Sequence, residues 1–269
     1  MADEKRSKDE EARRECLSQW AFVNGLYDKF GVELPYENIL GLNFERLVPV
    51  GGWVADIGAH SGFHTRRLRS IVGDEGRIAA FEPLAYFAGL LKDEFGQVAN
   101  VSVVECALSN FEGEAQFVVA RGTPEESGLQ QKAAYIFPDK ADLENVTVRV
   151  RTLDTVLRDW SRLDYVKIDI EGAELDCLEG AVSLLSRFRP IISFECGQAG
   201  YGQYGKTARD FLEFSTKHNY NILDLFGNDL SRQDLWYEVV DRARTWDFYY
   251  VPAERSAAVS DVLRLPGLP

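Results

Sequence analysis

The chain has 269 residues, of which 45% are hydrophobic, and its formal net charge is −13. This composition supplies a sizeable core and excludes a disordered chain, and no run approaches the ~20 apolar residues that cross a bilayer. The acidic balance without a basic face argues against a nucleic-acid partner, and we expect no secretory signal in the charged start, which lacks an apolar segment.

The first fifty residues predict a helical extension. Residues 15–30 carry apolar side chains at helical spacing and are followed by Gly31, a typical helix stop. A second, shorter helix is expected over residues 36–48. The charged residues 1–14 are expected to be a frayed helix or a disordered tail. Residues 1–50 therefore form an N-terminal extension ahead of the main domain.

Through the main domain, residues 51–269, short β-rich runs alternate with helical ones. The strands are expected at residues 52–58, 76–83, 101–109, 114–120, 146–153, 164–172, 189–197, 220–227 and 246–253. The helices are expected at residues 61–73, 84–96, 153–160, 173–188 and 208–219. Alternation of this kind predicts crossover connections and a mostly parallel sheet. The last two strands lack a long crossover helix between them, so we expect an antiparallel pair at the sheet edge.

Residues 121–145 do not follow this alternation. The segment has weak periodicity and two prolines, and it is long for a loop in a compact domain. It is either a lid or binding insertion, in which Ser127 and Gly128 contact a ligand, or a disordered surface insertion. The sequence leaves both interpretations open.

The four cysteines predict a location for the protein. Cys16, Cys106, Cys177 and Cys196 stand in apolar surroundings, and no two of them have Cys-x-x-Cys spacing. Buried free thiols are typical of a reducing compartment, so we expect a cytoplasmic protein.

The turn after the first strand of the main domain is the most specific feature of the sequence. In open parallel sheets, ligands bind beyond the carboxyl ends of the strands. A dinucleotide fingerprint has glycine where this sequence has Asp56, and a carboxylate there would repel a pyrophosphate. An acidic residue suits a ligand with positive charge, such as S-adenosylmethionine (SAM). Gly58 lets the chain turn tightly against the ligand, and Gly62 permits close packing of the next helix.

Glu82 ends the following strand and strengthens this interpretation. An acidic residue at that strand end binds ribose hydroxyls in nucleotide-binding folds. A nicotinamide enzyme would place one there too, so the combination of Asp56 and Glu82 favours SAM, whereas Glu82 alone does not. The alternative is that Asp56 only caps the helix and that Glu82 is a surface charge.

Several motifs together resemble the FkbM-type SAM-dependent methyltransferases. They are DIGAHSGFHT (56–65), AAFEP (79–83), VVECALSNFEGEAQF (103–117), RTLDTVL (151–157), DYVKIDIEGAELDCLEGA (164–181) and PIISFE (190–195). The similarity runs roughly from Trp53 to Val251 and leaves residues 1–50 without a counterpart. It implies the class I methyltransferase fold, a Rossmann-like α/β fold with a seven-stranded, mostly parallel sheet whose last strand is antiparallel. It also implies SAM as methyl donor and, usually, a sugar or other hydroxyl as acceptor.

The first turn and the resemblance together give a set of expected cofactor-binding residues. They are Asp56, Gly58, Ala59, His60, Gly62, Glu82, Ala107, Leu108, Ser109 and Asp169. The resemblance implies that the first turn lines the methionine end of SAM, that the acid of the second strand binds the ribose, and that residues 107–109 lie near the adenine. His60 departs from the family, which often has asparagine at this position, although an imidazole can fill the same polar role.

The segment 167–171 carries the expected catalytic group. Lys167, Asp169 and Glu171 alternate with two isoleucines, so in a strand they point the same way. Buried charge is costly unless paired, which favours a functional cleft, and an ion-paired structural cluster is the alternative. Because a hydroxyl acceptor must lose its proton, we expect Asp169 to act as general base, with His60 and Glu171 as further candidates.

The same carboxylates allow a metal-dependent alternative. Asp169 with Glu171 or Glu195 could hold Mg²⁺ against two substrate oxygens. We predict no metal site and keep this possibility as an alternative.

Two histidines and one loop carry weaker signals. The glycine-rich loop 197–206, with Tyr201 and Tyr204, either stacks on a sugar ring or is an ordinary loop. His64 and His218 are expected to be surface or packing residues, as lone histidines usually are.

The sequence thus predicts a SAM-dependent O-methyltransferase that acts on a small molecule or a sugar unit. N- or C-methylation is an alternative, as is a catalytically inactive SAM-fold protein that serves as a binding module. The intact Asp56 turn and Glu82 argue against the inactive form, and the missing glycine fingerprint argues against an NAD-linked oxidoreductase. We expect no nucleic-acid partner and no membrane span, and a homo-oligomer remains possible.

Overall fold

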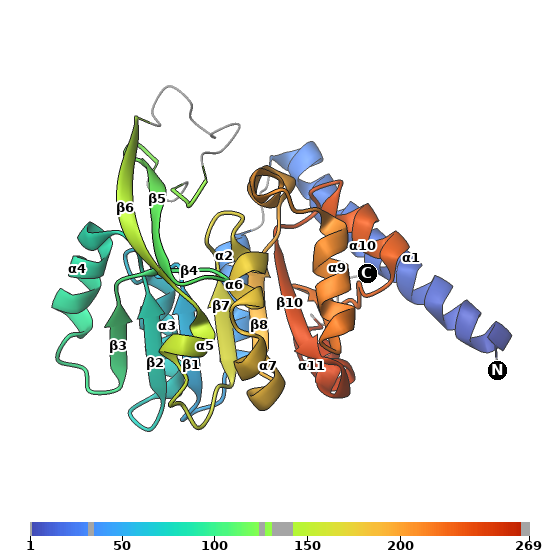
Figure 1. Cartoon of the computed structure of the whole chain (residues 1–269). Helices are drawn as coiled ribbons and strands as arrows, with labels where there is room; N and C mark the ends of the chain where they lie inside the picture. Colours follow the sequence, from blue (N-terminus) through green and yellow to red (C-terminus); the bar gives the residue numbers. More distant parts are fainter. Residues whose placement is uncertain (1, 32–34, 124–126, 131–141, 265–269) are drawn as a thin grey trace.

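A seven-stranded sheet forms the centre of the protein, whose computed structural model describes residues 2–31, 35–123, 127–130 and 142–264 (Figure 1). The strand order is β3-β2-β1-β7-β8-β10-β9. The strands are β1 (Trp53–Ile57), β2 (Arg77–Phe81), β3 (Val101–Val104), β7 (Tyr165–Ile168), β8 (Ile191–Glu195), β9 (Tyr220–Asp224) and β10 (Asp247–Pro252). Strand β10 is antiparallel to β8 and β9, and the remaining neighbours are parallel. The expected α/β fold and its antiparallel edge pair are confirmed.

Helices cover both faces of this sheet. They are α1 (Ala2–Phe30), α2 (Tyr36–Leu47), α3 (Phe63–Val72), α4 (Ala85–Phe95), α5 (Leu153–Val156), α6 (Glu174–Glu179), α7 (Val182–Phe188), α8 (Gln198–Tyr201), α9 (Ala208–Lys217), α10 (Gln233–Val240) and α11 (Ser256–Leu263). Successive strand residues enter opposite apolar layers: Tyr249 belongs to the layer that contains Phe44 of α2, and Tyr250 to the layer that contains Phe211 of α9. Strands buried on both faces account for the nearly continuous apolar runs in the sequence.

A smaller sheet stands above the carboxyl edge of the main one (Figure 1). It consists of β4 (Ala107–Leu108), β5 (Gly113–Ala120) and β6 (Leu143–Arg151) in the order β4-β6-β5. The prediction of a single strand over residues 101–109 was therefore wrong. The chain turns after Val104, whose carbonyl accepts from the backbone N–H of Cys106, and β4 then pairs with β6.

The predicted insertion at residues 121–145 falls on the tip of the β5–β6 hairpin. Its last residues belong to β6, and Gly128 forms a backbone bridge to Val118 of β5. Residues 124–126 and 131–141 lie outside the described part of the chain, so the lid interpretation stays a prediction.

The structure also corrects the predicted helices. The single helix expected at residues 173–188 is divided into α6 and α7 at Gly180, where a Cβ would lie 2.1 Å from the carbonyl oxygen of Ser109. The close approach of another backbone segment requires glycine there. Helix α10 between the last two strands and helix α11 after them had no predicted counterpart.

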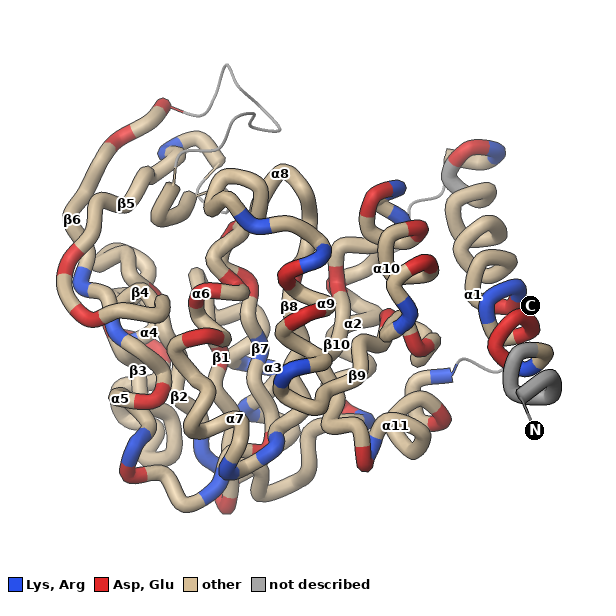
Figure 2. The backbone as a smooth tube through the Cα atoms, turned by 45° about the vertical axis from the view of Figure 1, so that its right-hand side comes forward, with Lys and Arg blue, Asp and Glu red and all other residues tan. Residues whose placement is uncertain are grey.

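The N-terminal extension is built into the core. Helix α1 begins at Ala2, which agrees with the helical one of the two expectations for residues 1–14. Its second half buries Cys16, Trp20 and Val23 in the main apolar layer. The Trp20 Nε1 donates to the buried carboxylate of Asp224 at 2.8 Å. Residues 8–15 of this helix carry charges of both signs (Figure 2), and the N-terminal part of the helix projects from the body (Figure 1).

The cysteines are buried as expected. All four cysteines are buried and free, and burial raises the pKa of the Cys106 thiol to about 11. Within the described residues, none of the helices has the length and apolar character that a membrane crossing needs.

Candidate active site

A cavity of about 510 Å³ lies at the carboxyl edge of the main sheet. Strands β1, β2, β7 and β8 end there and the antiparallel β10 begins there. Its described lining residues are Tyr36, Glu37, Gly58, Ala59, His60, Ser61, Phe63, His64, Glu82, Pro83, Leu84, Phe117, Ser127, Lys167, Asp169, Ile170, Glu171, Glu195, Trp246 and Asp247. Since ligands of parallel sheets bind at this edge, the cavity is the candidate active site.

The turn between β1 and α3 is clamped between the neighbouring strands. Gly58 has φ +77°, and a Cβ there would lie 1.9 Å from the carbonyl oxygen of Asp169. The backbone N–H groups of Gly58 and Ala59 donate to the carbonyl of Phe81 at 3.1 and 2.9 Å. Glycine is therefore required at position 58, because no other residue fits both the φ angle and the contact with β7. Gly62, with φ +86°, opens helix α3 where it packs against α4.

Asp56 does not line the cavity. Its side chain is completely buried, and Oδ2 accepts a hydrogen bond from the Thr65 hydroxyl at 2.6 Å. The Lys167 ammonium lies 3.9 Å from Oδ1. Asp56 thus supports the turn from below, through Thr65 of α3 and Lys167 of β7, and Gly58 and Ala59 present the turn to the cavity.

Glu82 faces the cavity from the end of β2. Its two carboxylate oxygens accept from the backbone N–H groups of His60 and Leu84, both at 2.9 Å. Burial raises the pKa of Glu82 to about 7, although these two hydrogen bonds act in the opposite direction. The His60 backbone has φ +48°, and its ring lies over Phe87 with the centroids 3.8 Å apart. The carboxylate is thereby fixed in position for a polar ligand.

Residues 107–109, which were expected beside the adenine, do not all reach the cavity. Ala107 and Leu108 line a small apolar hollow of about 20 Å³ next to the cavity, together with Pro83 and Ile170. Ser109 lies outside both, with its backbone N–H donating to the carbonyl of Arg151. Two of the three predicted residues are therefore close to the cavity.

Lys167 and Asp169 form an ion pair inside the cavity. The ammonium of Lys167 lies 3.2 Å from Oδ2 of Asp169 and donates to the carbonyl of Gly58 at 3.2 Å. Burial by itself would raise the pKa of Asp169, but the charge and hydrogen bond of Lys167 and a hydrogen bond from Glu195 lower it below its ordinary value. Asp169 is therefore ionised at neutral pH, and its side chain is 39% exposed toward the cavity.

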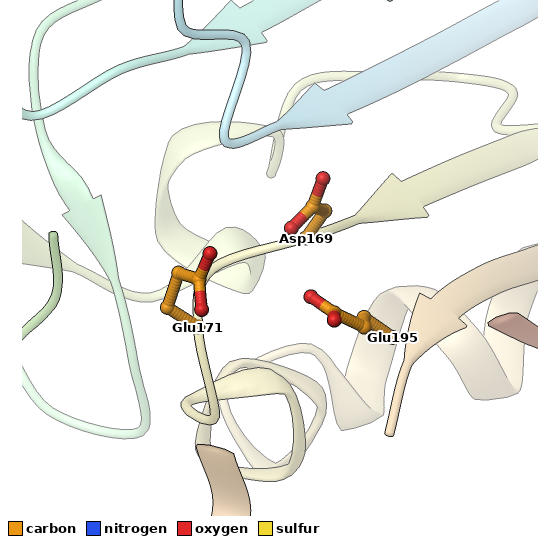
Figure 3. A group of neighbouring side chains, drawn as sticks. All are labelled: Asp169, Glu171 and Glu195. Atoms are coloured by element: carbon orange, nitrogen blue, oxygen red, sulfur yellow. The ribbon is translucent and has the colours of Figure 1, made fainter. Parts of the chain in front are cut away.

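Two further carboxylates approach Asp169. Oxygen atoms of Asp169, Glu171 and Glu195 all lie within 4.8 Å of one another, and the side chains point toward a common centre (Figure 3). Burial and the negative charges of Asp169 and Glu171 raise the pKa of Glu195 well above its usual value. Glu171 has φ +60°, a strained conformation for a residue with a side chain. The buried Glu174 carboxylate holds this turn by accepting from the N–H groups of Ile170 and Gly172 at 3.0 and 3.1 Å.

Sequence reasoning missed several residues of the cavity wall. Tyr36 and Glu37 come from the extension, and Trp246 and Asp247 come from the start of β10. No local pattern marks them, because distant segments reach the cavity through the topology of the sheet. His64, interpreted as a surface or packing residue, lines the cavity and lies 2.8 Å from Glu37 through its Nε2.

Only some of the residues with weaker sequence signals reach the cavity. Ser127 lines the cavity, whereas Gly128 lies beside it in the β5–β6 hairpin. Tyr201 is buried against Phe211 in the core and does not reach the cavity, so the loop 197–206 offers no stacking surface through that ring. His218 ends α9 away from the cavity, as expected.

Comparison with known proteins identifies similar chains. A family model described as the methyltransferase FkbM domain matches residues 56–222. AMB antimetabolite synthetase AmbE of Pseudomonas aeruginosa strain PAO1 is 26% identical over 261 residues, covering 85% of this chain and 11% of that protein. This chain therefore spans about a tenth of the length of its curated relative.

Solved structures give weaker similarities. The FkbM methyltransferase of Methylobacillus flagellatus KT has a TM-score of 0.47 at 17% identity, covering 74% of this chain and 43% of that chain. Fibrillarin of Aeropyrum pernix, solved with bound S-adenosyl-L-methionine, has a TM-score of 0.41 at 15% identity, covering 89% of this chain and 76% of that chain.

Proposed function

This chain belongs to the FkbM methyltransferase family, and on that premise we propose that it transfers the methyl group of SAM to a hydroxyl of a small molecule, such as a sugar unit. One observation carries the proposal: the cavity at the carboxyl edge has Gly58, Glu82 and Asp169 side by side on three neighbouring strand ends. The antimetabolite synthetase named above supports a small-molecule acceptor.

The described residues fit SAM at each of its parts. Glu82 is held by two backbone N–H groups and keeps lone pairs for the ribose hydroxyls. Gly58 and Ala59 would lie along the methionine end, and Ala107 and Leu108 give the adjoining wall an apolar surface against which an adenine ring would pack. Carboxylates at this edge disfavour a diphosphate by electrostatic repulsion, which disfavours a nicotinamide dinucleotide.

We assign the remaining cofactor residues supporting roles. Asp56 acts through Thr65 and Lys167, which fix the turn and the catalytic strand. Gly62 permits the approach of α3 to α4, and Ser109 holds the adenine segment to β6 through the backbone of Arg151.

Asp169 is our assignment for the general base. SAM supplies an electrophilic methyl group on a sulfonium, and the acceptor oxygen must lie in line with it and lose its proton. Asp169 is ionised, partly open to the cavity, and held by Lys167 at 3.2 Å. Glu195, whose pKa is raised well above its usual value, donates a hydrogen bond to Asp169. His60 and Glu171 line the same cavity and remain the alternative bases.

We propose that the reaction needs no metal. The Lys167 ammonium already lies 3.2 Å from Asp169, one of the three clustered carboxylates. Turnover that stops with EDTA and returns with Mg²⁺ would instead assign a cation to Asp169, Glu171 and Glu195.

Calorimetry with S-adenosylhomocysteine and with NAD tests the cofactor. We expect micromolar binding of the first and no binding of the second. Glu82→Gln should weaken S-adenosylhomocysteine binding about tenfold, and Asp56→Ala should weaken it strongly through the loss of the turn. Glu213→Gln, an exposed change on α9, serves as the matched control. Binding of NAD alone would refute the proposal.

A methyl-transfer assay with labelled SAM tests the base. Asp169→Asn should lower turnover about 100-fold or more while leaving S-adenosylhomocysteine affinity unchanged. Unchanged turnover would move the role to His60 or Glu171. The four buried free thiols fit our expectation of a cytoplasmic enzyme.

A further inference from the structure

Three carboxylates stand on neighbouring strand ends beyond the part of the cavity that fits SAM. The β7–β8 register pairs Ile168 with Phe194, so Asp169 and Glu195 follow side by side. The β8–β10 register pairs Glu195 directly with Asp247. Adjacent strands are about 4.8 Å apart, and like charges directly opposite each other destabilise a sheet. The acids of this row can all be ionised together only if a positive charge beyond that of Lys167 lies beside them.

The protein provides little of that charge. Six of the described lining residues are Asp or Glu, and one is a lysine or arginine, namely Lys167. Lys167 already pairs with Asp169 and Asp56 and donates to the carbonyl of Gly58. Glu37 of α2 adds another carboxylate to the wall on the side of Asp247 and raises the pKa of that acid together with burial and Asp169.

We infer that the methyl acceptor is a hydroxylated amine, whose ammonium group binds against Asp169, Glu195 and Asp247 while its hydroxyl receives the methyl group. This inference rests on the proposed function and specifies the acceptor class of the same site.

His64 provides an independent indication of a polar ligand. It lines the cavity, it is 8% exposed, and its Nε2 lies 2.8 Å from the carboxylate of Glu37. Nε2 pairs with Glu37, which leaves Nδ1 as the second polar atom of the ring. Nδ1 is buried and has no hydrogen-bond partner among the described residues, so it calls for a polar group of a ligand.

Aromatic side chains in the same wall favour an organic ammonium over a metal ion. Tyr36, Phe63 and Trp246 line the cavity beside the carboxylates. Aromatic faces attract ammonium groups, and the cavity of about 510 Å³ exceeds the size of a single ion many times.

The ammonium group holds the acceptor in the site, and its nitrogen is not the atom that is methylated. Carboxylates around an amine raise its pKa and keep it protonated, and a protonated nitrogen has no lone pair to attack the methyl group. A hydroxyl on the same molecule keeps its lone pairs and lies within reach of Asp169. The geometry therefore agrees with O-methylation.

Binding of a cation to this row also releases protons. Burial and the neighbouring Asp169 and Glu37 raise the pKa of Asp247 to about 7, and burial and Asp169 raise the pKa of Glu195 well above its usual value. An ammonium group stabilises the ionised carboxylates and lowers these pKa values, so protons leave as the amine binds.

The test uses matched pairs of amine and neutral hydroxyl compounds. Dissociation constants are measured by ligand-observed NMR and calorimetry at pH 7.0 with S-adenosylhomocysteine present, for D-glucosamine against D-glucose and for ethanolamine against ethylene glycol. Each amine should bind about tenfold more tightly than its neutral partner and should release protons when two buffers are compared. Asp247→Asn and Glu37→Gln should each lower the preference about threefold or more. Asp93→Asn, an exposed change on α4, should leave it unchanged.

Two results overturn the inference. Amines that bind no more tightly than their neutral partners, including undetectable binding of both, exclude an ammonium site. Mg²⁺ that binds alone and excludes the amines assigns the row to a metal. Loss of S-adenosylhomocysteine binding is a different result, because it refutes the proposed function, and the amine titrations are repeated without that ligand to judge the ammonium site separately.

Discussion

Replacing Lys167 by methionine probes the electrostatic support of the site. Lys167 is 3% exposed and lies between Asp169 at 3.2 Å and Asp56 at 3.9 Å. Lys167→Met keeps most of the side-chain volume but removes the charge that neutralises two carboxylates. Breaking a buried ion pair on one side costs about 3–5 kcal/mol. Because Asp169 is partly open to the cavity, we expect the lower end, a loss of about 3 kcal/mol in the free energy of unfolding.

The pH dependence of this loss follows from the directions of the two pKa shifts. The lowered pKa of Asp169 contributes stability that is present above about pH 4 and is lost as the pH falls through its folded-state pKa. Burial alone would lower the pKa of Lys167, but Asp169 and Asp56 raise it, and this contribution is present below about pH 10 and is lost at higher pH. The difference between wild type and variant should therefore be largest near neutral pH and shrink at both extremes.

Urea unfolding followed by tryptophan fluorescence and circular dichroism measures the loss. Lys217→Met at the exposed end of α9 is the matched control, with an expected change within about 0.5 kcal/mol. Lys167→Met combined with Asp56→Asn also removes one of the two carboxylate charges that faced the lysine. The double variant should therefore recover part of the lost free energy of unfolding. A loss below about 1 kcal/mol at pH 7, or no recovery in the double variant, would refute the reasoning.

Two further predictions concern the anchoring of the extension and the turn beneath the site. Trp20→Phe removes the 2.8 Å donor to the buried Asp224 and should cost about 2 kcal/mol by urea unfolding, and an unchanged midpoint would show that α1 is not anchored there. Burial raises the pKa of Glu174 to about 7, so stability should fall as the pH rises from about 4.5 to 7, where the unfolded chain ionises first. Glu174→Gln should flatten that dependence, and an equally steep profile in the variant would contradict it.

Much of the fold follows from local sequence patterns. Strand and helix periodicity predicted the alternation of the main domain and its antiparallel edge pair, because side-chain spacing records which face of an element is buried. The errors occurred where distant backbone segments meet. The break after Val104 depends on pairing with β6, and the break at Gly180 depends on the carbonyl of Ser109.

In the site, too, local patterns predicted some features, and contacts between distant segments decided the others. The sequence by itself determined the turn at Gly58, the acid at the end of β2 and the charged residues at the end of β7. Each of these features depends on only a few consecutive residues, so a local pattern is enough to identify it. Only the tertiary structure decided that Asp56 supports the turn from the interior, that Glu37 reaches His64, and that Asp247 stands opposite Glu195. These contacts join segments far apart in the chain, and strand order and register, which local spacing does not encode, bring them together.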